Sequence, residues 1–446
     1  MLTKKELNEI WRLYPDSYAH KCSNGKFKLY EHIKFISEKV VPEIAKGGAR
    51  ICISVPPRHG KSEFLSYWLP IWFLEMWPEK RIILASYAAE LAQTFGRKIR
   101  DECSSNDLVK VKLSENSQAA HRFDTNEKGG MIAVGVGGPI TGKGAHLFLI
   151  DDPYKDFEEA MSERQRTKII DWYQSVARSR LEPGGSMIVI MTRWHENDLC
   201  GFLIKNHGFM EIKMPAIAEE NDILGRSPGQ TLCLDRYSEE DFKSIKHDVG
   251  SYKWNSLYQQ NPIPIEGGLF KRVWWKTYRG LHNYTKIVQF WDCAQKVGIT
   301  NDYSVCATWG VTENGFHLLD IWRNKVEAPQ LEQAVKNMFD KFRPQAVVIE
   351  DKSSGSSIIQ NIRQKTLIPV IAFDPKQRDK EVRASAVTPT VEAGKCFIPE
   401  SAPWLEDFLL EHERFPNAEH DDQVDTTSMA LEHLSNKTAQ PRIRQL

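Results

Sequence analysis

The sequence predicts an α/β protein with two sheets, a doubly wound parallel sheet followed by a mixed one. Apolar runs with the length of buried strands alternate with helical segments in the first half of the chain. In the second half, three such runs follow one another at hairpin-like separations before the helices begin. At 446 residues the chain is also too long for one ordinary domain, so we expect two.

The first domain is expected over 1–215, with a helical segment over 1–48. Its apolar runs are short and continuous and are separated by helical spacing, which is typical of buried parallel strands. The expected strands are 51–55, 81–86, 131–136, 147–150 and 187–191, and a charged helix is expected over 158–181.

The pattern weakens over 216–268, where Pro, Gly and short polar stretches dominate, so we interpret this segment as a linker region. The second domain is expected over 269–435, followed by a tail at 436–446. Its expected elements are strands at 287–291, 303–309 and 316–322, a helix at 330–342, a strand at 346–349, a helix at 357–365, a strand at 369–373 and a helix at 423–434. This is the element order of an RNase H-like fold.

Composition narrows the function classes. Lys+Arg and Asp+Glu both number 59, so the formal charge is zero, which argues against a constitutive nucleic-acid coat protein. The eight cysteines include no C-x-x-C pair, so we expect neither zinc nor a disulfide framework, and a reducing, cytoplasmic setting fits. We expect no secretory leader, and no uncharged apolar run approaches the ~18 residues of a membrane span.

A phosphate-binding loop is predicted directly after the first apolar run, at Val55-Pro-Pro-Arg-His-Gly-Lys-Ser62. Backbone N–H groups and the dipole of the following helix would face an anion there. Lys61 can reach the β- and γ-phosphates, and Ser62 can take a magnesium ligand position. The expected ATP-binding residues of this loop are Arg58, His59, Gly60, Lys61 and Ser62. The usual pattern opens with Gly, and this chain has Val55 instead.

The apolar run at 147–150 ends in Asp151 and Asp152. A carboxylate at the end of a buried strand is where a P-loop enzyme holds its magnesium ion, so Asp151 is the expected ligand. We expect Asp152 to position the attacking water, with Glu158 or Glu159 as alternatives. A helix cap before Pro153 is the structural alternative for both aspartates.

Thr192 and Arg193 follow the next buried run, at 187–191. A polar side chain at this place can sense the γ-phosphate, and we expect Thr192 to contribute to ATP binding. A surface salt bridge is the alternative for this pair.

Acidic residues also stand at element boundaries of the second domain. One ends the strand at 287–291, one ends the strand at 346–349, and three open the last helix. Carboxylates that converge at one edge of a sheet can hold two divalent ions ~3.5–4 Å apart, one activating water and one stabilising the leaving oxygen. The expected metal ligands are Asp292, Glu350, Asp421, Asp422 and Asp425, and all except Asp421 are expected to be catalytic. The alternative for Asp421 and Asp422 is a helix N-cap.

Together these motifs resemble the large terminase subunits of tailed double-stranded DNA phages. The resemblance is carried by the loop at 55–62, the Asp-Asp strand, the stretch 192–198 (TRWHEND), the stretch 258–262 (YQQNP) before Glu266-Gly-Gly268, and the acidic positions. It extends from about residue 28 to residue 434.

The resemblance implies a genome-packaging motor. Its N-terminal domain would hydrolyse ATP with Mg²⁺ to translocate double-stranded DNA into a procapsid, and its C-terminal endonuclease, with Mg²⁺ or Mn²⁺, would cut the concatemer at initiation and termination. The implied partners are a portal protein, a small terminase subunit and further copies in a ring of five. The implied setting is the host cytoplasm, transiently at the portal vertex.

By the same analogy Thr192 falls in the coupling motif. Ring ATPases of this kind receive an arginine from a neighbouring subunit. This chain has Lys143 where relatives often have Arg, so Lys143, Arg178 and Arg180 are the candidates for a trans-acting role.

Two other functions remain open on the residues. A helicase or repair ATPase–nuclease predicts duplex unwinding. A nucleotide-switch assembly factor with a degenerate nuclease domain predicts ATP binding with negligible turnover and no cleavage.

Overall fold

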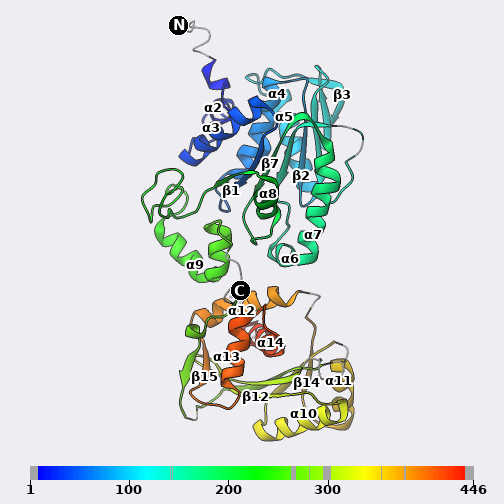
Figure 1. Ribbon diagram of the computed structural model, residues 1–446, viewed down its shortest axis with the longest axis vertical. Helices are drawn as coiled ribbons and strands as arrows, with labels where there is room; N and C mark the ends of the chain where they lie inside the picture. The colour runs from blue at the N-terminus through cyan, green and yellow to red at the C-terminus, as the bar shows by residue number, and fades with distance from the viewer. Residues whose placement is uncertain are drawn as a thin grey trace, which may run out of the picture. The chain divides into compact units, whose positions relative to one another are not determined.

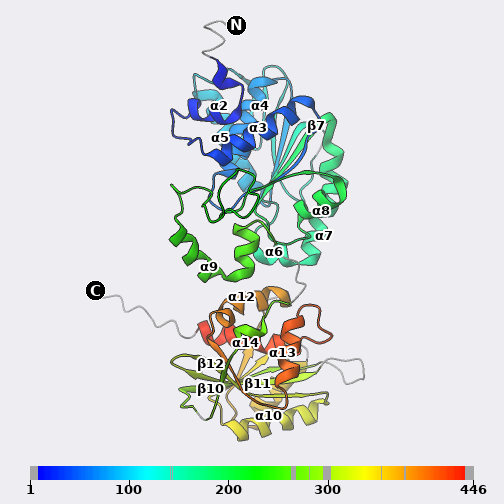
Figure 2. The same cartoon turned by 60° about the vertical axis from the view of Figure 1, so that its left-hand side comes forward.

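The computed structural model describes residues 9–140, 142, 144–262, 268–280, 282–294, 303–352, 354–375 and 378–436. These residues form two compact units, which Figures 1 and 2 show in two views. The first unit consists of 9–246 and 253–262, and the second of 247–252 and 268–436. Most of the segment that we interpreted as a linker region therefore groups with the first unit.

The first unit contains an eight-stranded sheet with the order β3-β4-β5-β2-β6-β7-β1-β8. Its strands are β1 (Arg50–Ser54), β2 (Arg81–Ser86), β3 (Leu113–Ala119), β4 (Arg122–Thr125), β5 (Gly130–Gly135), β6 (Ala145–Asp151), β7 (Leu181–Met191) and β8 (Met210–Lys213). From β5 to β8 every neighbouring pair is parallel, whereas β3 and β4 add an antiparallel edge.

Alternate residues of the same strand belong to two different cores, as the period of two in a strand requires. Ile82 and Leu84 of β2 belong to one core, and Ile83 belongs to the other. The helices are α2 (Pro15–Cys22), α3 (Glu31–Lys46), α4 (Leu69–Met76), α5 (Ala89–Ser105), α6 (Phe157–Met161), α7 (Glu163–Trp172), α8 (Leu199–His207) and α9 (Glu239–Lys253). In Figure 1, α3 and α7 lie on opposite sides of the sheet. The doubly wound parallel sheet is confirmed.

The second unit contains a seven-stranded mixed sheet with the order β14-β13-β10-β11-β12-β15-β9. Its strands are β9 (Lys276–Tyr278), β10 (Lys286–Asp292), β11 (Ser304–Thr312), β12 (Gly315–Asn324), β13 (Ala346–Glu350), β14 (Val370–Phe373) and β15 (Cys396–Pro399). Strand β11 runs antiparallel to both of its neighbours, and the remaining pairs are parallel.

The helices of the second unit are α10 (Ala328–Phe342), α11 (Ser354–Lys365), α12 (Lys380–Glu392), α13 (Leu405–Arg414) and α14 (Asp422–Asn436). Residues of α10 and α11 share one core with the sheet, and residues of α12, α13 and α14 share the other. Figure 2 shows α10 on one side of the sheet and α12 and α14 on the other. The expected RNase H-like element order is confirmed, with α12, α13 and the strands β15 and β9 beyond β12 added. None of the helices that the structure describes is both long and apolar enough to span a bilayer.

The single helix expected over 158–181 is wrong in detail. The chain forms α6 and α7 separately and then continues through two short helical segments, η3 (Tyr173–Ala177) and η4 (Arg178–Arg180), into β7. The break between α6 and α7 falls at Ser162, whose backbone is extended with φ −71° and ψ 116°. One extended residue is enough to interrupt the hydrogen-bond ladder of a helix.

Candidate functional site

The loop between β1 and the helical turn η2 (Glu63–Trp68) is built around two residues with left-handed backbone. Arg58 has φ 63° and Gly60 has φ 82°, a conformation that glycine adopts freely and arginine rarely does. Val55 lies before this turn, fully buried in the core that also holds Ile53. The turn is therefore made at Arg58 and Gly60, and the position where the usual pattern has Gly is occupied by a core side chain.

His59 supports the loop through its ring. The ring is 1% exposed, and its centroid lies 5.4 Å from that of Tyr237 and 6.2 Å from that of Phe242. Burial lowers the pKa of His59 to about 4, so the ring is neutral at pH 7. The His59 carbonyl accepts a hydrogen bond from His32 Nε2 at 2.9 Å. Any contact of His59 with a phosphate thus falls to its backbone N–H group.

Five expected residues of the ATP site lie together at the carboxyl ends of three neighbouring strands. Lys61 Nζ lies 3.0 Å from Thr192 Oγ1 and 3.0 Å from Asp152 Oδ2. Ser62 Oγ donates to Asp151 Oδ1 at 3.1 Å. These contacts arise because β1, β7 and β6 are adjacent and parallel, so the residues that follow them meet at one edge of the sheet.

The two aspartates differ in their surroundings. Asp151 is 2% exposed, and burial, with the neighbouring Asp152 charge, raises its pKa to about 7. Asp152 has φ 41°, and its Oδ1 accepts the Thr192 N–H at 3.2 Å. A buried carboxylate beside a serine hydroxyl is an oxygen donor pair that fits a magnesium ion. The alternatives lie elsewhere: Glu159 accepts from the Lys155 N–H at the start of α6, and Glu158 is exposed.

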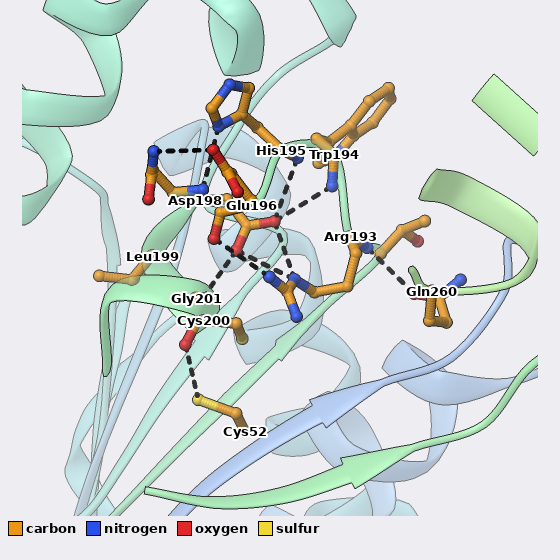
Figure 3. A network of polar contacts seen from close by, with 12 residues as sticks. Cys52, Arg193, Trp194, His195, Glu196, Asp198, Leu199, Cys200, Gly201 and Gln260 are labelled. Carbon is orange, nitrogen blue, oxygen red and sulfur yellow. Dashed lines mark hydrogen bonds and ion pairs between the residues drawn. The ribbon is translucent and has the colours of Figure 1, made fainter. Parts of the chain in front are cut away.

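Arg193 belongs to a buried network beside this site (Figure 3). Its Nε lies 3.0 Å from each carboxylate oxygen of Asp198, which also accepts N–H bonds from Trp194, His195 and Gly201. Both partners of the ion pair are buried, at 6% and 0% exposure. Arg193 therefore forms a salt bridge, as the alternative expected, but the ion pair is buried and not at the surface. Of Thr192 and Arg193, it is Thr192 that contacts Lys61.

Gln260 joins the same network, and sequence reasoning gave it no role beyond the resemblance. The Arg193 N–H donates to Gln260 Oε1 at 3.0 Å, and the side chain of Gln260 is fully buried. The neighbouring Gln259 bonds both backbone groups of Ile217, at 3.0 Å each. Two adjacent glutamines at a helix end were the only signal in the sequence.

Two of the three candidates for a trans-acting role, Arg178 and Arg180, do not lie near Lys61 of the same chain. Arg178 and Arg180 form η4, directly before β7, whereas Thr192 follows the other end of that strand. They therefore lie toward the amino ends of the parallel strands, whereas Lys61 and Thr192 lie at the carboxyl ends. Lys143 is outside the described residues.

The expected acidic residues of the second unit gather from three elements. Asp292 ends β10 and Glu350 ends β13, and the two strands pair in parallel with Trp291 opposite Ile349. Helix α14 packs against β10 and β11 and carries Asp422 and Asp425 in its first turn, and Asp421 directly precedes it. We call Asp292, Glu350, Asp421, Asp422 and Asp425 the carboxylate cluster.

The electrostatics of the cluster show how close these groups are. The pKa of Asp292 is raised well above its usual value, first by burial and then by Asp425, Glu350 and Asp422. The Tyr303 N–H donates to Asp422 Oδ2 at 3.2 Å. A set of carboxylate oxygens is the donor set that Mg²⁺ and Mn²⁺ prefer.

Cations from helix α12 contact this cluster. Arg383, which is 2% exposed, lies 3.2 Å from Glu350 Oε1 and 2.8 Å from Asp425 Oδ1. Lys380 Nζ lies 2.6 Å from Asp421 and 2.9 Å from Asp425. Within the described residues, no three His, Cys, Asp or Glu side chains are arranged to hold a metal ion as they stand. Arg383 and Lys380 engage carboxylate oxygens that a metal ion would use.

The comparisons with known proteins agree with both halves of the chain. Residues 52–277 match the family model "Terminase large subunit, T4likevirus-type, N-terminal", and residues 289–434 match "Terminase RNaseH-like domain". A comparison with curated proteins finds no match.

Solved structures of large terminases are similar at low sequence identity. The large terminase of the thermophilic bacteriophage D6E is 12% identical, with 92% of this chain and 100% of that chain covered and a TM-score of 0.50. The large terminase of bacteriophage HK97 is 12% identical over 86% of this chain and 88% of that chain, with a TM-score of 0.40. The magnesium-bound large terminase nuclease of the thermophilic phage G20c is 15% identical over 38% of this chain and 98% of that chain, with a TM-score of 0.29. The D6E likeness shows a shared fold.

The two family models follow one another in the order of the two units, and the first alone covers more than half of the chain. This chain therefore belongs to the large terminase subunits, an enzyme family with an ATPase and a nuclease domain.

Proposed function

We propose that this chain is the motor and the nuclease of a phage genome-packaging machine. It hydrolyses ATP to translocate double-stranded DNA into a procapsid, and it cuts concatemeric DNA at initiation and termination. The observation that supports this proposal is that one chain brings together the expected side chains of both sites, around Lys61 in the first unit and in the carboxylate cluster of the second.

In the first unit, Lys61 holds the β- and γ-phosphates of ATP, and its contact with Thr192 lets the end of β7 respond to the γ-phosphate. Ser62 and Asp151 would hold Mg²⁺, which neutralises phosphate charge when bound. The side chain of Asp152 orients the attacking water. Its backbone is held in place because the Asp152 N–H donates to the Ile190 carbonyl at 2.8 Å. The N–H groups of Arg58, His59 and Gly60 face the phosphates.

In the second unit, Asp292, Glu350, Asp422 and Asp425, with Asp421 beside them, would hold Mg²⁺ or Mn²⁺, which activates water and stabilises the leaving oxygen when bound. These residues converge on one edge of the sheet because β10 and β13 are parallel neighbours. The chain's own contribution is to fix these oxygens and to position the DNA backbone against them.

Membership of the large terminase family supports the partners with which such subunits assemble. We propose that several copies, five in a complete ring, act on the portal of the procapsid in the host cytoplasm, with a small terminase subunit that selects the DNA. An arrangement in a ring would give Lys143, Arg178 or Arg180 a place at the ATP site of the adjacent copy.

A packaging reaction with purified procapsids tests the proposal, with DNase-protected DNA as the readout. Wild-type protein should protect DNA, hydrolyse ATP and cut plasmid with Mn²⁺. Lys61→Ala should lose ATPase and packaging but keep cleavage, and Asp292→Asn should lose cleavage but keep ATPase. Lys46→Ala, in an exposed ion pair with Glu43, is the matched control. ATP-driven separation of duplex strands without protection would contradict the proposal.

A further inference from the structure

A surface cavity of about 530 Å³ lies in the second unit and has no role in the function proposed above. Its lining includes Thr285, directly before β10, and Thr312 and Asn314 at the turn between β11 and β12. Asp292 of the carboxylate cluster is at the opposite end of β10, about 20 Å along the strand. The cavity is therefore separate from the nuclease centre, and its volume is in the ~300–1,000 Å³ range of small-molecule sites.

Aromatic side chains line this cavity. The ring centroid of His317 lies 4.8 Å from those of Tyr278 and His282. It lies 4.7 Å from that of Phe397 and 5.6 Å from that of Tyr284. We call these five side chains the aromatic cluster, and all except Tyr284 are part of the cavity lining. His282 is exposed, and Tyr278 and Phe397 are half-buried, so ring surface remains available to a ligand.

The sheet places this cluster on the face opposite to α12, α13 and α14. His317 of β12 and Phe397 of β15 are directly opposite each other. The residues before and after them belong to the core that the sheet shares with those three helices, namely Phe316, Leu318, Cys396 and Ile398. Since successive side chains of a strand point to opposite faces, His317 and Phe397 lie on the other face. No member of the aromatic cluster belongs to the core that α10 and α11 share with the sheet.

Two glycines allow the rings to approach the backbone closely. Gly310 is the partner of His317 in the β11–β12 pair, and a Cβ atom there would lie 2.5 Å from the Tyr284 ring. A Cβ atom at Gly315 would lie 3.2 Å from the Phe397 ring. The backbone therefore fixes the positions of these rings, and a site that is already formed costs a ligand less ordering entropy.

His317 has hydrogen-bonding capacity that the described residues do not satisfy. It is 4% exposed, and its Nδ1 has no hydrogen-bond partner among them. Burial, and to a lesser degree His282, lowers the pKa of His317 to about 4, so at pH 7 the ring is neutral, with one donor and one acceptor. A buried nitrogen without a partner costs free energy, which a ligand with a matching group would recover. The amides of Asn283 and Asn314, both exposed, add donors and acceptors to the lining.

The charges of the lining exclude a strongly ionic ligand. Among the described residues that line the cavity, Arg279 and Glu313 are the only arginine, lysine, aspartate or glutamate side chains. Arg279 is already ion-paired with Glu400, and Glu313 is exposed. A phosphate or a cation would therefore find little compensating charge. A flat, uncharged ligand with several donors and acceptors fits the rings and the amides, and a nucleobase has this chemistry.

We propose that the cavity beside the aromatic cluster binds an unpaired nucleobase, which stacks on the cluster and hydrogen-bonds through its edge to His317 and to Asn283 or Asn314. A base inside a duplex is already stacked and paired, so the ligand is a base outside the duplex. Such a base can come from a DNA strand or from a free nucleoside. The choice of DNA rests on the proposed function of the chain.

Fluorescence titration of a short single-stranded oligodeoxynucleotide that carries one 2-aminopurine tests the inference, because stacking on an aromatic ring quenches this base. The full-length chain is used with EDTA and without nucleotide. Wild type should quench the single strand and should not quench the same base in a duplex. His317→Leu, which keeps the buried volume, and His282→Ala, at an exposed position that does not threaten folding, should each weaken binding about 10-fold.

His247→Leu is the matched control, because it removes an exposed histidine of the same unit outside the cavity, and it should behave as wild type. The deoxyriboside of 2-aminopurine distinguishes the two sources. Quenching of this nucleoside that His317→Leu weakens would mean that a free base suffices. Quenching of the oligonucleotide alone would assign the site to a base in a strand, and both results support a nucleobase site.

Equal affinity of wild type, His317→Leu and His282→Ala for the single strand would overturn the inference, and a cavity that takes a peptide side chain would give this result. Equal quenching of the single strand and the duplex by wild type would also overturn it. Because EDTA and the absence of nucleotide stop both cleavage and ATP hydrolysis, this outcome is independent of the proposed function. Loss of Asp292-dependent cleavage in a separate plasmid assay would overturn the nuclease function alone.

Discussion

At the scale of single residues, Arg193 shows how a charged side chain next to a reacting group can serve the fold. It directly follows Thr192, which contacts Lys61, but its guanidinium is ion-paired to Asp198 inside the unit. A buried carboxylate that accepts three backbone N–H bonds and an arginine organises the whole 193–201 turn. Removing Arg193 would leave the charge of Asp198 buried without its ion-pair partner.

We predict that Arg193→Met lowers the free energy of unfolding of the first unit by about 3–5 kcal/mol, because breaking a buried pair costs that much. Urea denaturation followed by tryptophan fluorescence measures it. Arg122→Met, which removes a half-exposed pair with Asp124 at 3.9 Å, should change it by less than about 1 kcal/mol. A folded Arg193→Met protein of normal stability that fails to bind ATP would show instead that Arg193 acts on the nucleotide.

The second prediction at this scale concerns His59 and pH. Its folded pKa is about 4, below the unfolded value of about 6.5, so the unfolded state binds more protons between these values. The stability that neutral His59 contributes is complete above pH 6.5 and is lost as the pH falls toward 4, by up to about 1.4 kcal/mol per pH unit.

We therefore expect His59→Phe, which keeps the ring contacts with Tyr237 and Phe242, to make the stability of the first unit less sensitive to pH between about 6.5 and 4. Urea denaturation at several pH values measures the slope. His121→Gln, at an exposed position, should leave the slope of wild type unchanged. Parallel slopes for wild type and His59→Phe would contradict the assignment.

At the scale of elements, helix α14 depends on a cap from a different helix. Glu411 of α13 is 6% exposed and accepts the N–H groups of Gln423 and Val424 at 2.7 and 3.3 Å. The first N–H groups of a helix have no partner within it, so a carboxylate there stabilises both the hydrogen bonding and the dipole of the helix. This cap also sets the position of Asp422 and Asp425.

We predict that Glu411→Ala destabilises the second unit by about 2–4 kcal/mol, since it leaves buried N–H groups and Arg323 without their partner. It should also reduce Mn²⁺-dependent cleavage by displacing the start of α14. Glu406→Ala, on the same helix in an exposed pair with Arg272, should cost less than about 1 kcal/mol. Equal stability of the two variants, measured by urea denaturation, would remove the capping role.

The elements also show what could be predicted from the sequence. The strands that carry the sites are continuous apolar runs, so β1, β6, β7, β10 and β13 could be located together with the acidic or polar residues that follow them. Helix α12 could not be located from the sequence. Its own buried residues, from Val382 to Val391, do not follow a helical spacing, and Pro389 lies inside it. A helix without an apolar stripe cannot be predicted from the period of its apolar residues. The sequence therefore did not show that Lys380 and Arg383 lie one turn apart on the same helix.

Polar contacts between residues far apart in the sequence could not be predicted for a different reason. The pairing of Arg193 with Asp198 spans only five residues, and a salt bridge was one of the two interpretations of the sequence. The contact of Arg193 with Gln260 spans 67 residues and depends on how the chain returns to the sheet. No pattern in a single sequence reports such a pairing, whereas parallel strand ends are related by a general rule of topology.

At the scale of the whole molecule, each compact unit has cores of its own. The first unit's cores extend from Tyr18 to Leu232, and the second unit's from Leu269 to Leu434. Each of the two sites lies within one unit, the Lys61 site in the first and the carboxylate cluster in the second. A ligand of one site should therefore stabilise one unit.

We predict two unfolding transitions in the full-length chain, with different ligand responses. With Mg²⁺ present at one concentration in both samples, a nonhydrolysable ATP analogue should raise only the transition of the first unit. Mn²⁺ added without nucleotide or Mg²⁺ should raise only that of the second. A ligand at 100 times its Kd contributes about 2.7 kcal/mol, which raises Tm by about 5–10 °C for units of this size. Differential scanning calorimetry measures both. Lys61→Ala should abolish the first shift and Asp292→Asn the second, each leaving the other intact. A single transition whose Tm either ligand raises would show that the two units unfold together. The prediction that each ligand stabilises one unit alone would then be wrong.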